Sequence, residues 1–341
     1  MRVRSTLATA AVSVLVAGTL SACGSDTASP PAGQAAAKTK DVTLMLNWYP
    51  YGEHAALYYG QKQGIYKKHG INLTIRAGQG STKTVQAVGA NQVDFGWADT
   101  PALMAAISKG VPAKSVGVFL QTTPASVEFF TTANIKTPQD LKGRTIATTI
   151  GDAPSATFPA YLKANGLTEA DVKLQAVDPA GKIAAVMSGR TDALLGFAHD
   201  QGPIIAEKSG KEVSYLRFAD GGINFLSNGL LASDSMLAKD RPLVDQMVAA
   251  TREAFTEAVK HPDEAVASMK GSSPQLPSDA VLKHSWAETE KLLSTDATKG
   301  KAPGVNAESD WLHTIDVFAK AGTLKNPGKP SDYWVDIPAT G

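Results

Sequence analysis

The chain has 341 residues, with 33 basic and 32 acidic side chains and a formal net charge of +1, so neither charge sign dominates. It has no basic run and no alternation of basic with aromatic residues, which argues against a nucleic-acid partner. Hydrophobic residues make up 43% of the chain, enough for the core of one large domain or two modest domains.

The first 22 residues have the layout of a bacterial export signal. Arg2 and Arg4 precede an apolar stretch, residues 7–20, that is too short to span a bilayer as a mature helix. Residues 20–23 have the sequence LSAC, which resembles a lipobox, where the cysteine sulfur receives a diacylglycerol and cleavage occurs just before it. We expect a signal peptide over 1–22 and a lipid anchor on Cys23 at the extracytoplasmic face of the membrane. The alternative is an ordinary secretory signal followed by a chance cysteine.

Residues 23–40 continue as a tether. They are mainly Ser, Ala, Pro, Gly, Thr and Lys without an apolar period, which is typical of a flexible linker. Cys23 is the only cysteine of the chain. The folded part therefore offers no disulfide, no cysteine nucleophile and no cysteine-based metal site.

Short apolar strands alternate with helices from residue 41 onward. Strands are predicted at 42–47, 71–76, 93–97, 145–150, 174–177 and 193–197, and helices at 54–68, 82–90 and 101–109. This alternation is typical of α/β layers around mainly parallel sheets. Residues 243–318 are predicted to be mostly helical.

Two segments share one plan. Residues 85–94 and 184–192 each predict a helix, a glycine turn and a strand that an aspartate opens. We therefore predict two α/β lobes, one formed by 41–128 with 225–341 and the other by 129–224. The extended runs 126–132 and 223–232 are predicted to cross between the lobes, and two crossovers form a hinge.

These features resemble a solute-binding protein of an ABC importer with the periplasmic-binding-protein type II fold. The matching motifs are NWYP at 47–50 followed by His54, GS at 80–81, VDFG at 93–96, DLKGRTI at 140–146 and GRTDA at 189–193. They resemble the family that binds thiamine pyrimidine precursors, sulfonates, taurine and nitrate, over nearly all of residues 41–260. Asn47 and Tyr51 stand where that family often has Asp and Asn. The resemblance implies a monomeric binder that delivers a small molecule to a permease and its ATPase.

The candidate ligand site follows from the fold, because ligands of open α/β sheets lie beyond the carboxyl ends of the strands. Trp48 and Tyr51 are expected to sandwich a flat ring; a core role is the alternative for Trp48. Ser81 either caps a helix or helps Gly80 to bind a ligand with backbone N–H groups, and Asp99 either caps a helix or accepts from the ligand. The full set of expected ligand-binding residues is Asn47, Trp48, Tyr51, His54, Gly80, Ser81, Thr82, Trp97, Asp99, Thr100, Glu128, Thr149, Asp152, Phe197, His199, Asp200 and Asn224.

The charges of this set indicate the ligand's chemistry. Arg76 and Lys83 are the plausible basic neighbours, whereas the acidic members are Asp99, Glu128, Asp152 and Asp200. A sulfonate or nitrate ion would favour Arg and Lys. We therefore expect a pyrimidine-like or other heteroaromatic ligand with N–H donors, and a sulfonate, taurine or nitrate ligand is the alternative.

A binding protein without cofactor or metal is favoured over an enzyme. The six histidines are scattered, and neither a nucleophile elbow nor a zinc-protease motif is present. His199 and Asp200 are adjacent, so they are expected to hydrogen-bond a ligand rather than to form a catalytic pair. Two alternatives remain: an enzyme similar to the thiamine pyrimidine synthase, which carries a cysteine-rich motif, and a sensory module that presents its closed form to a receptor.

Overall fold

The computed structural model describes residues 39–338. The predicted signal peptide and Cys23 lie outside the described residues, as does most of the tether. The first strand, β1 (Lys40–Met45), begins two residues earlier than predicted, and Lys40 already pairs with Ile71. The fold therefore includes the last residue assigned to the tether. Within 39–338, no helix combines the length and the hydropathy that a membrane span requires.

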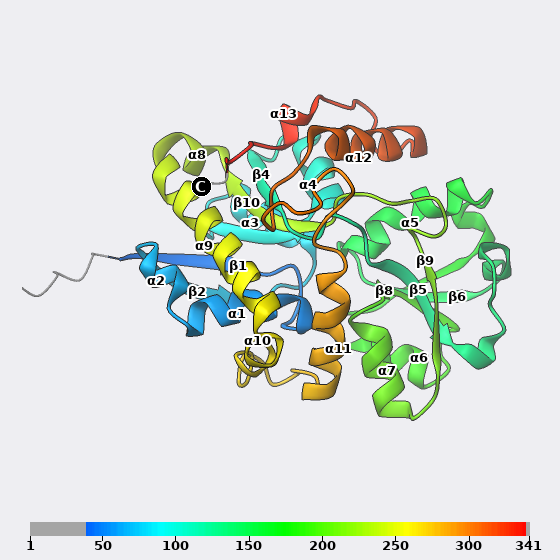
Figure 1. The fold of residues 1–341 in the computed structure, drawn as a ribbon. Helices are drawn as coiled ribbons and strands as arrows, with labels where there is room; N and C mark the ends of the chain where they lie inside the picture. Colours follow the sequence, from blue (N-terminus) through cyan, green and yellow to red (C-terminus); the bar gives the residue numbers. More distant parts are fainter. Residues whose placement is uncertain (1–38, 339–341) are drawn as a thin grey trace, which may run out of the picture. The chain divides into compact units, whose positions relative to one another are not determined.

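Five strands form the sheet of the first lobe (Figure 1). Their order is β2 (Ile71–Arg76), β1, β3 (Phe95–Asp99), β10 (Asn228–Ser233) and β4 (Ala113–Val118). The strands β2, β1 and β3 are parallel, whereas β10 runs antiparallel between β3 and β4. The predicted strand at 71–76 is confirmed, and its period of two places Ile71 and Leu73 in the core and Asn72 at the surface.

The sheet of the second lobe repeats this plan. Its order is β7 (Lys173–Ala176), β6 (Thr145–Thr148), β8 (Ala193–Phe197), β5 (Ala125–Phe130) and β9 (Val213–Arg217). Again three strands are parallel and the fourth, β5, is antiparallel to both of its neighbours. The two-lobed α/β architecture predicted from the sequence is confirmed.

The internal repeat has a physical basis in two aspartates. Asp94 Oδ2 accepts a hydrogen bond of 2.8 Å from the backbone N–H of Thr43, and Asp192 Oδ2 accepts one of 2.8 Å from Thr145. Each aspartate immediately precedes the third strand of its sheet and thus ties the start of that strand to the neighbouring parallel strand. The shared motif marks equivalent positions, β3 and β8, in the two sheets.

The connections between the lobes lie elsewhere than predicted. The run at 126–132 is mostly β5, inside the second sheet, and the run at 223–232 ends in β10, inside the first. The chain crosses instead at 119–124 and 218–227, which are tied by the Ser227 N–H to Leu120 carbonyl hydrogen bond of 2.8 Å. The predicted lobe boundary after Glu128 falls inside β5. Apolar alternation identified these strands but carried no information about which sheet accepts them.

Helices surround both sheets, and 3-10 turns occur at Gly52–His54, Thr131–Ala133, Pro138–Leu141 and Glu169–Asp171. The α-helices are α1 (Ala55–Lys62), α2 (Ile65–Lys68), α3 (Ser81–Gly89), α4 (Thr100–Ile107), α5 (Ala153–Ala164), α6 (Gly181–Met187), α7 (Gln201–Ser209), α8 (Asp234–Lys239), α9 (Arg241–Lys260), α10 (Pro262–Ala267), α11 (Asp279–Glu290), α12 (Glu308–Ala321) and α13 (Pro330–Tyr333). The helix predicted at 54–68 is divided, because Gly64 adopts a left-handed conformation with φ 72° between α1 and α2.

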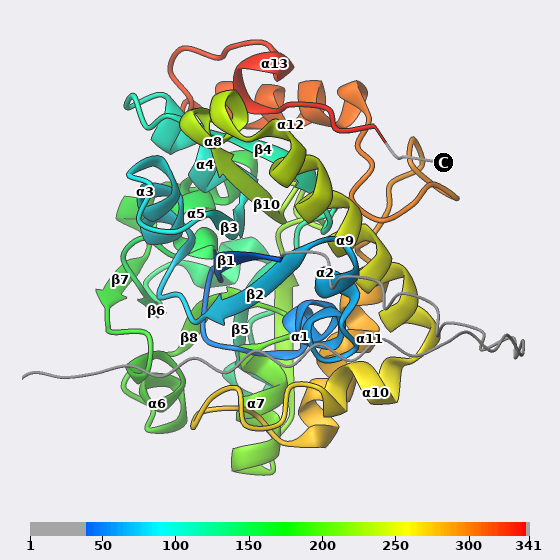
Figure 2. The ribbon, with the colours of Figure 1, turned by 90° about the vertical axis from the view of Figure 1, so that its left-hand side faces the viewer.

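The C-terminal helices serve both lobes. Helix α9 packs along α1 and α2 of the first lobe (Figure 2), and Trp286 of α11 is buried in the same core. Helix α12 differs from the prediction, since it packs on α5 of the second lobe. Trp311 of α12 lies in a cluster with Phe158 and Phe218 rather than in the first-lobe core. The C-terminal segment therefore does not return wholly to the first lobe.

Candidate functional site

A small cavity lies between the two lobes, beyond the carboxyl ends of β1, β6 and β8. Its volume is about 20 Å³, enough for little more than one water molecule. The first lobe contributes Asn47, Trp48, Tyr51, Gly80 and Ser81, and the second lobe contributes Asp152, Ala153, Pro154, Lys182, Phe197, Asp200 and Gln201. Eight of the residues selected from the sequence line this cavity, and the strand-end rule explains why.

Glu53 is the centre of the hydrogen-bond network behind the cavity, and sequence reasoning missed it. Its Oε1 accepts from Trp97 Nε1 at 2.7 Å and from Asn228 Nδ2 at 2.6 Å. Its Oε2 accepts from the Tyr51 hydroxyl at 2.5 Å and contacts His199 Nε2 at 3.2 Å. Glu53 is fully buried, so these four groups replace the water that its charge would otherwise require. No local motif indicates this role, because Trp97, Asn228 and His199 are distant from Glu53 in the sequence.

The network sets the ionisation of Glu53 and Tyr51. Burial alone would raise the pKa of Glu53, but hydrogen bonds that favour the charged form, including those from His199 and Trp97, lower it below its ordinary value. Burial and the nearby Glu53 charge raise the pKa of Tyr51 far above its ordinary range. Glu53 is thus an anion at neutral pH, and Tyr51 is its neutral donor.

His54 holds Asn47 in place from behind the cavity. Its Nε2 lies 2.8 Å from Asn47 Oδ1, and its Nδ1 accepts from the Tyr51 backbone N–H at 3.4 Å. Since Nδ1 accepts, Nε2 carries the proton, and the ring is neutral. Burial lowers the pKa of His54 to about 4, which agrees with this tautomer. His54 therefore positions a residue of the cavity wall and does not itself line the wall.

A buried ion pair forms the second-lobe wall. Lys182 Nζ bonds Asp152 Oδ2, donates to the Leu195 carbonyl at 2.8 Å and lies 5.1 Å from the centre of the Trp48 ring. The predicted basic neighbours, Arg76 and Lys83, are exposed and lie at a separate surface hollow instead. The expectation about basic neighbours was wrong, because a lysine in the first turn of α6 gives no sequence signal of its place in the cleft.

Burial raises the pKa of two carboxyl groups of the second lobe. Asp200 lies beside Gln201, and burial raises the pKa of Asp200 to about 7. Glu128 accepts from the Ser126 hydroxyl at 3.0 Å, its other oxygen has no hydrogen-bond partner among the described residues, and burial raises its pKa far above its ordinary range. Glu128 is a buried carboxyl group of β5 and does not line the cavity.

The first-lobe strand β3 ends in a similar buried carboxyl. Asp99 Oδ2 accepts from the Ser227 hydroxyl at 2.8 Å, and burial raises the pKa of Asp99 to about 7. Asp99 precedes α4, but its side chain makes no cap bond. The predicted cap at Ser81 was also wrong: Gly80 is the N-cap of α3, and Ser81 accepts from the Asp99 N–H at 3.2 Å.

The other selected residues support the site without lining the cavity. Trp97 is fully buried and stacks on Phe255, so it is a core residue. Thr100 and Thr149 donate to backbone carbonyls, and Asn224 accepts from Thr123 at the crossovers. Thr82 and His199 belong to a separate group, because both contact the opposite lobe.

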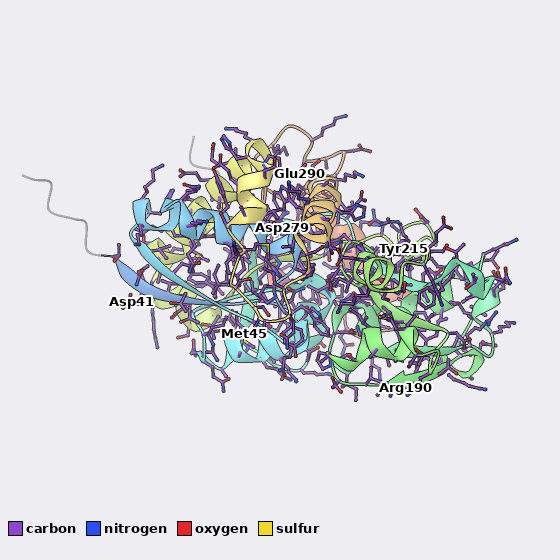
Figure 3. The ribbon with its side chains drawn as sticks, turned by 90° about the horizontal axis from the view of Figure 1, so that it is seen from below. Asp41, Met45, Arg190, Tyr215, Asp279 and Glu290 are labelled. Carbon is purple, nitrogen blue, oxygen red and sulfur yellow. The ribbon has the colours of Figure 1, made fainter. Side chains whose placement is uncertain are left out.

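The lobes touch directly across the cleft. The Thr82 N–H donates to the Gly151 carbonyl at 3.1 Å, and His199 reaches Glu53. At the rim, Ser278 bonds Glu207, where α11 packs against α7. Figure 3 shows α11, labelled at its ends Asp279 and Glu290, between the first lobe and the second, where Tyr215 is labelled. The structure is therefore a closed arrangement of the two lobes.

A larger groove continues outward from the cavity and shares Trp48, Tyr51, Asp200 and Gln201 with it. The groove has a volume of about 350 Å³. Its outer wall is mainly apolar and comes from α6, α7 and the loop before α11; the apolar residues there are Pro179, Ala180, Ile183, Ala184, Met187, Ile204, Leu276 and Pro277. The small inner cavity thus opens into a longer cleft between the lobes.

Known proteins match the chain over most of its length. Residues 52–265 match the family described as NMT1/THI5 like. The chain is 26% identical over 330 residues to the riboflavin-binding protein RibY of Chloroflexus aurantiacus, covering 92% of each protein. It is 24% identical over 250 residues to the formylaminopyrimidine-binding protein of Halalkalibacterium halodurans, covering 72% of this chain and 73% of that one.

Solved structures share the fold. The alkanesulfonate-binding protein SsuA from Xanthomonas axonopodis pv. citri, bound to MOPS, matches with a TM-score of 0.68 and 17% identity, over 88% of this chain and 100% of that one. Such a likeness shows the fold alone. The periplasmic-binding-protein fold predicted from the sequence is confirmed.

Proposed function

The chain belongs to the NMT1/THI5-like family, and from that premise we propose that it is the extracytoplasmic substrate-binding component of an ABC importer. In this proposal it captures a small neutral heteroaromatic solute between its lobes and presents the closed form to a permease and its ATPase. A lipid on Cys23 would keep it at the membrane.

The observation that carries the proposal is the composition of the interlobe cavity. Trp48 and Tyr51 from the first lobe face Phe197 from the second, so aromatic surface is available on both sides. Aromatic pairs add about 0.5–1.5 kcal/mol beyond the burial of their area. Asn47 and Gln201 add amide groups that fix orientation.

Charge favours a neutral ligand over a sulfonate. Among the described residues that line the cavity, Lys182 is the cation, and Asp152 already neutralises it. Asp200 adds a partial negative charge near pH 7, and Glu53 adds a full one behind the wall. Two like charges about 6 Å apart repel by roughly 3 kcal/mol at an effective dielectric constant of about 20. A sulfonate would meet that repulsion, whereas a heterocycle with N–H donors would not.

Two relatives support the same class of ligand. RibY and the formylaminopyrimidine-binding protein are, by their names, binders of a flavin and of a pyrimidine. Both ligands are flat heterocycles with ring nitrogens. We extend to this chain the class that these ligands share, and neither particular compound.

Closure of the two lobes around the ligand would couple binding to transport. The cavity is too small to admit a heterocycle while the lobes touch, so the lobes must part at the crossovers 119–124 and 218–227. Binding drives transport only if the ligand favours the closed form over the open form. A ligand that contacts both walls of the cavity has that preference, because an open cleft separates its partners.

Binding rather than catalysis fits the two histidines nearest the cavity. His54 is tied to Asn47 and His199 to Glu53. Neither histidine lines the cavity, so neither is placed to exchange a proton with a bound molecule. The competing proposal of a pyrimidine-synthase-like enzyme would require a group that reacts, and the cavity wall offers hydrogen bonds and aromatic surface instead.

Isothermal titration calorimetry tests the ligand class. The panel contains lumichrome, 4-amino-2-methylpyrimidine and taurine. We expect binding of at least one heterocycle and at least tenfold weaker binding of taurine; the reverse order would contradict the proposal. Uptake of the bound heterocycle by cells that express the chain with and without a candidate permease and its ATPase then separates import from a sensory role.

A further inference from the structure

The buried ion pair between Lys182 and Asp152 is an unusual feature of the cavity wall. Lys182 belongs to α6 and is 2% exposed, and Asp152 is the N-cap residue of α5 and is 3% exposed. A buried ion pair contributes little net stability, because desolvation of both charges offsets their attraction. Its place in a ligand cavity therefore suggests a role in recognition.

Lys182 and Asp152 each retain hydrogen-bonding positions that their contacts within the protein do not use. Lys182 has three N–H donors, of which two go to Asp152 and to the Leu195 carbonyl. Asp152 Oδ1 accepts from the Ser155 N–H at 2.9 Å, and Oδ2 accepts from Lys182. Each carboxylate oxygen can accept a second bond. The wall thus presents an ammonium donor immediately beside a carboxylate acceptor.

The position of Trp48 connects this polar pair to the aromatic surface. Lys182 Nζ lies 5.1 Å from the centre of the Trp48 ring, within the range of a cation–π contact. Trp48 belongs to the first lobe and Lys182 to the second. Both residues line the cavity together with Asp152. A flat ligand in the cavity that contacts Trp48 would therefore also lie beside the Lys182–Asp152 pair when the lobes close.

We propose that the Lys182–Asp152 pair is the specificity-determining element of the site and reads one edge of the ligand. Lys182 donates to a ring carbonyl or ring nitrogen, and Asp152 accepts from the adjacent N–H. Both an aminopyrimidine edge and the pyrimidinedione edge of a flavin ring offer this arrangement. A sulfonate offers acceptors alone, so Asp152 repels it. The inference rests on the proposed function, since it assigns the hydrogen-bonding pattern of the same ligand.

Methylation of the ligand's N–H tests the edge. Calorimetry compares lumichrome with N3-methyl-lumichrome, and 4-amino-2-methylpyrimidine with its 4-dimethylamino analogue, on the full chain. We expect methylation to weaken binding at least tenfold in the wild type. The D152S/K182M variant removes both charges, keeps a serine cap for α5 and fills the lysine's volume with methionine. In that variant the methylation penalty should fall below threefold.

A control and a second measurement keep the test decisive. K173M changes an exposed lysine of the same lobe and should retain the full methylation penalty. An equal penalty in wild type and D152S/K182M overturns the inference while leaving the proposed function intact. Binding of taurine with no binding of either heterocycle overturns both. Should the double variant fail to fold, a crystal structure of wild type with lumichrome decides, and a ring edge turned away from Lys182 and Asp152 overturns the inference.

Discussion

Removal of the Glu53 carboxylate is the most informative perturbation of this protein. Glu53 gathers donors from Trp97, Asn228, Tyr51 and His199, and the last of these belongs to the opposite lobe. The donors differ in one respect that matters for substitution. Trp97 and Asn228 present N–H groups that cannot reverse their role, whereas a tyrosine hydroxyl and a neutral histidine can also accept.

This difference determines how much stability each of two matched substitutions loses. In Glu53→Gln, the amide oxygen can still accept from Trp97 and Asn228, and the amide nitrogen can donate to Tyr51 and His199. All four charge-assisted bonds then become neutral bonds, but an amide costs less to bury than a carboxylate, so we expect a net loss of about 2 kcal/mol. In Glu53→Ala, both fixed donors lose their acceptor, at about 1–3 kcal/mol each, and the other two bonds disappear. We expect a loss of about 4 kcal/mol or more.

Urea denaturation at pH 7 measures both losses, and Glu169→Gln at an exposed site is the control, with a change within about 0.5 kcal/mol. The pH dependence adds a second check. Because the folded pKa of Glu53 lies below its ordinary 4.5, its stabilisation is present above pH 4.5 and is lost as pH falls through the lowered value. The gap between wild type and Glu53→Gln should therefore narrow in acid. Equal stability of the Gln and Ala variants, or a Gln variant as stable as wild type, would refute the account of Glu53.

Three further predictions concern the cleft. Trp48→Ala should weaken heterocycle binding roughly 30-fold by calorimetry, since a stacked aromatic contributes about 2 kcal/mol. The melting temperature should stay within a few degrees of wild type because Trp48 is half-buried; a large drop in melting temperature would make Trp48 a core residue. Gly80→Ala should reduce ligand affinity at least tenfold, because the new Cβ would lie 2.8 Å from the Gly151 carbonyl oxygen of the opposite lobe and would hinder closure. Gly143→Ala is the control: Gly143 also has a positive φ, 74°, but open space around it, so this variant should bind normally. For Asp99→Asn, the free energy of unfolding relative to wild type should rise by about 2–3 kcal/mol from pH 5 to pH 8, because the raised pKa of Asp99 makes wild-type stability fall with rising pH until about 7. The same difference in unfolding free energy between variant and wild type at both pH values would contradict this.

The fold was largely readable from local sequence patterns. The alternation of strands and helices predicted two α/β lobes, and the repeated aspartate motif marked β3 and β8. The pattern failed at the crossovers, where β5 was predicted to leave the sheet that it joins. Hydrophobic period reports which face of a strand is buried and does not report the neighbour against which it is buried.

The site divides in the same way. The sequence determined which strand ends would meet, and it therefore placed Asn47, Trp48, Tyr51 and Asp152 at the cavity, because the carboxyl ends of parallel strands converge at one edge. Only the tertiary structure decided the electrostatics. Glu53 accepts a hydrogen bond from Asn228, which is 175 residues later in the chain, and Lys182 pairs with Asp152, which is 30 residues earlier. The ionisation of a buried group depends on these distant neighbours, and the spacing of residues along one strand or helix does not encode them.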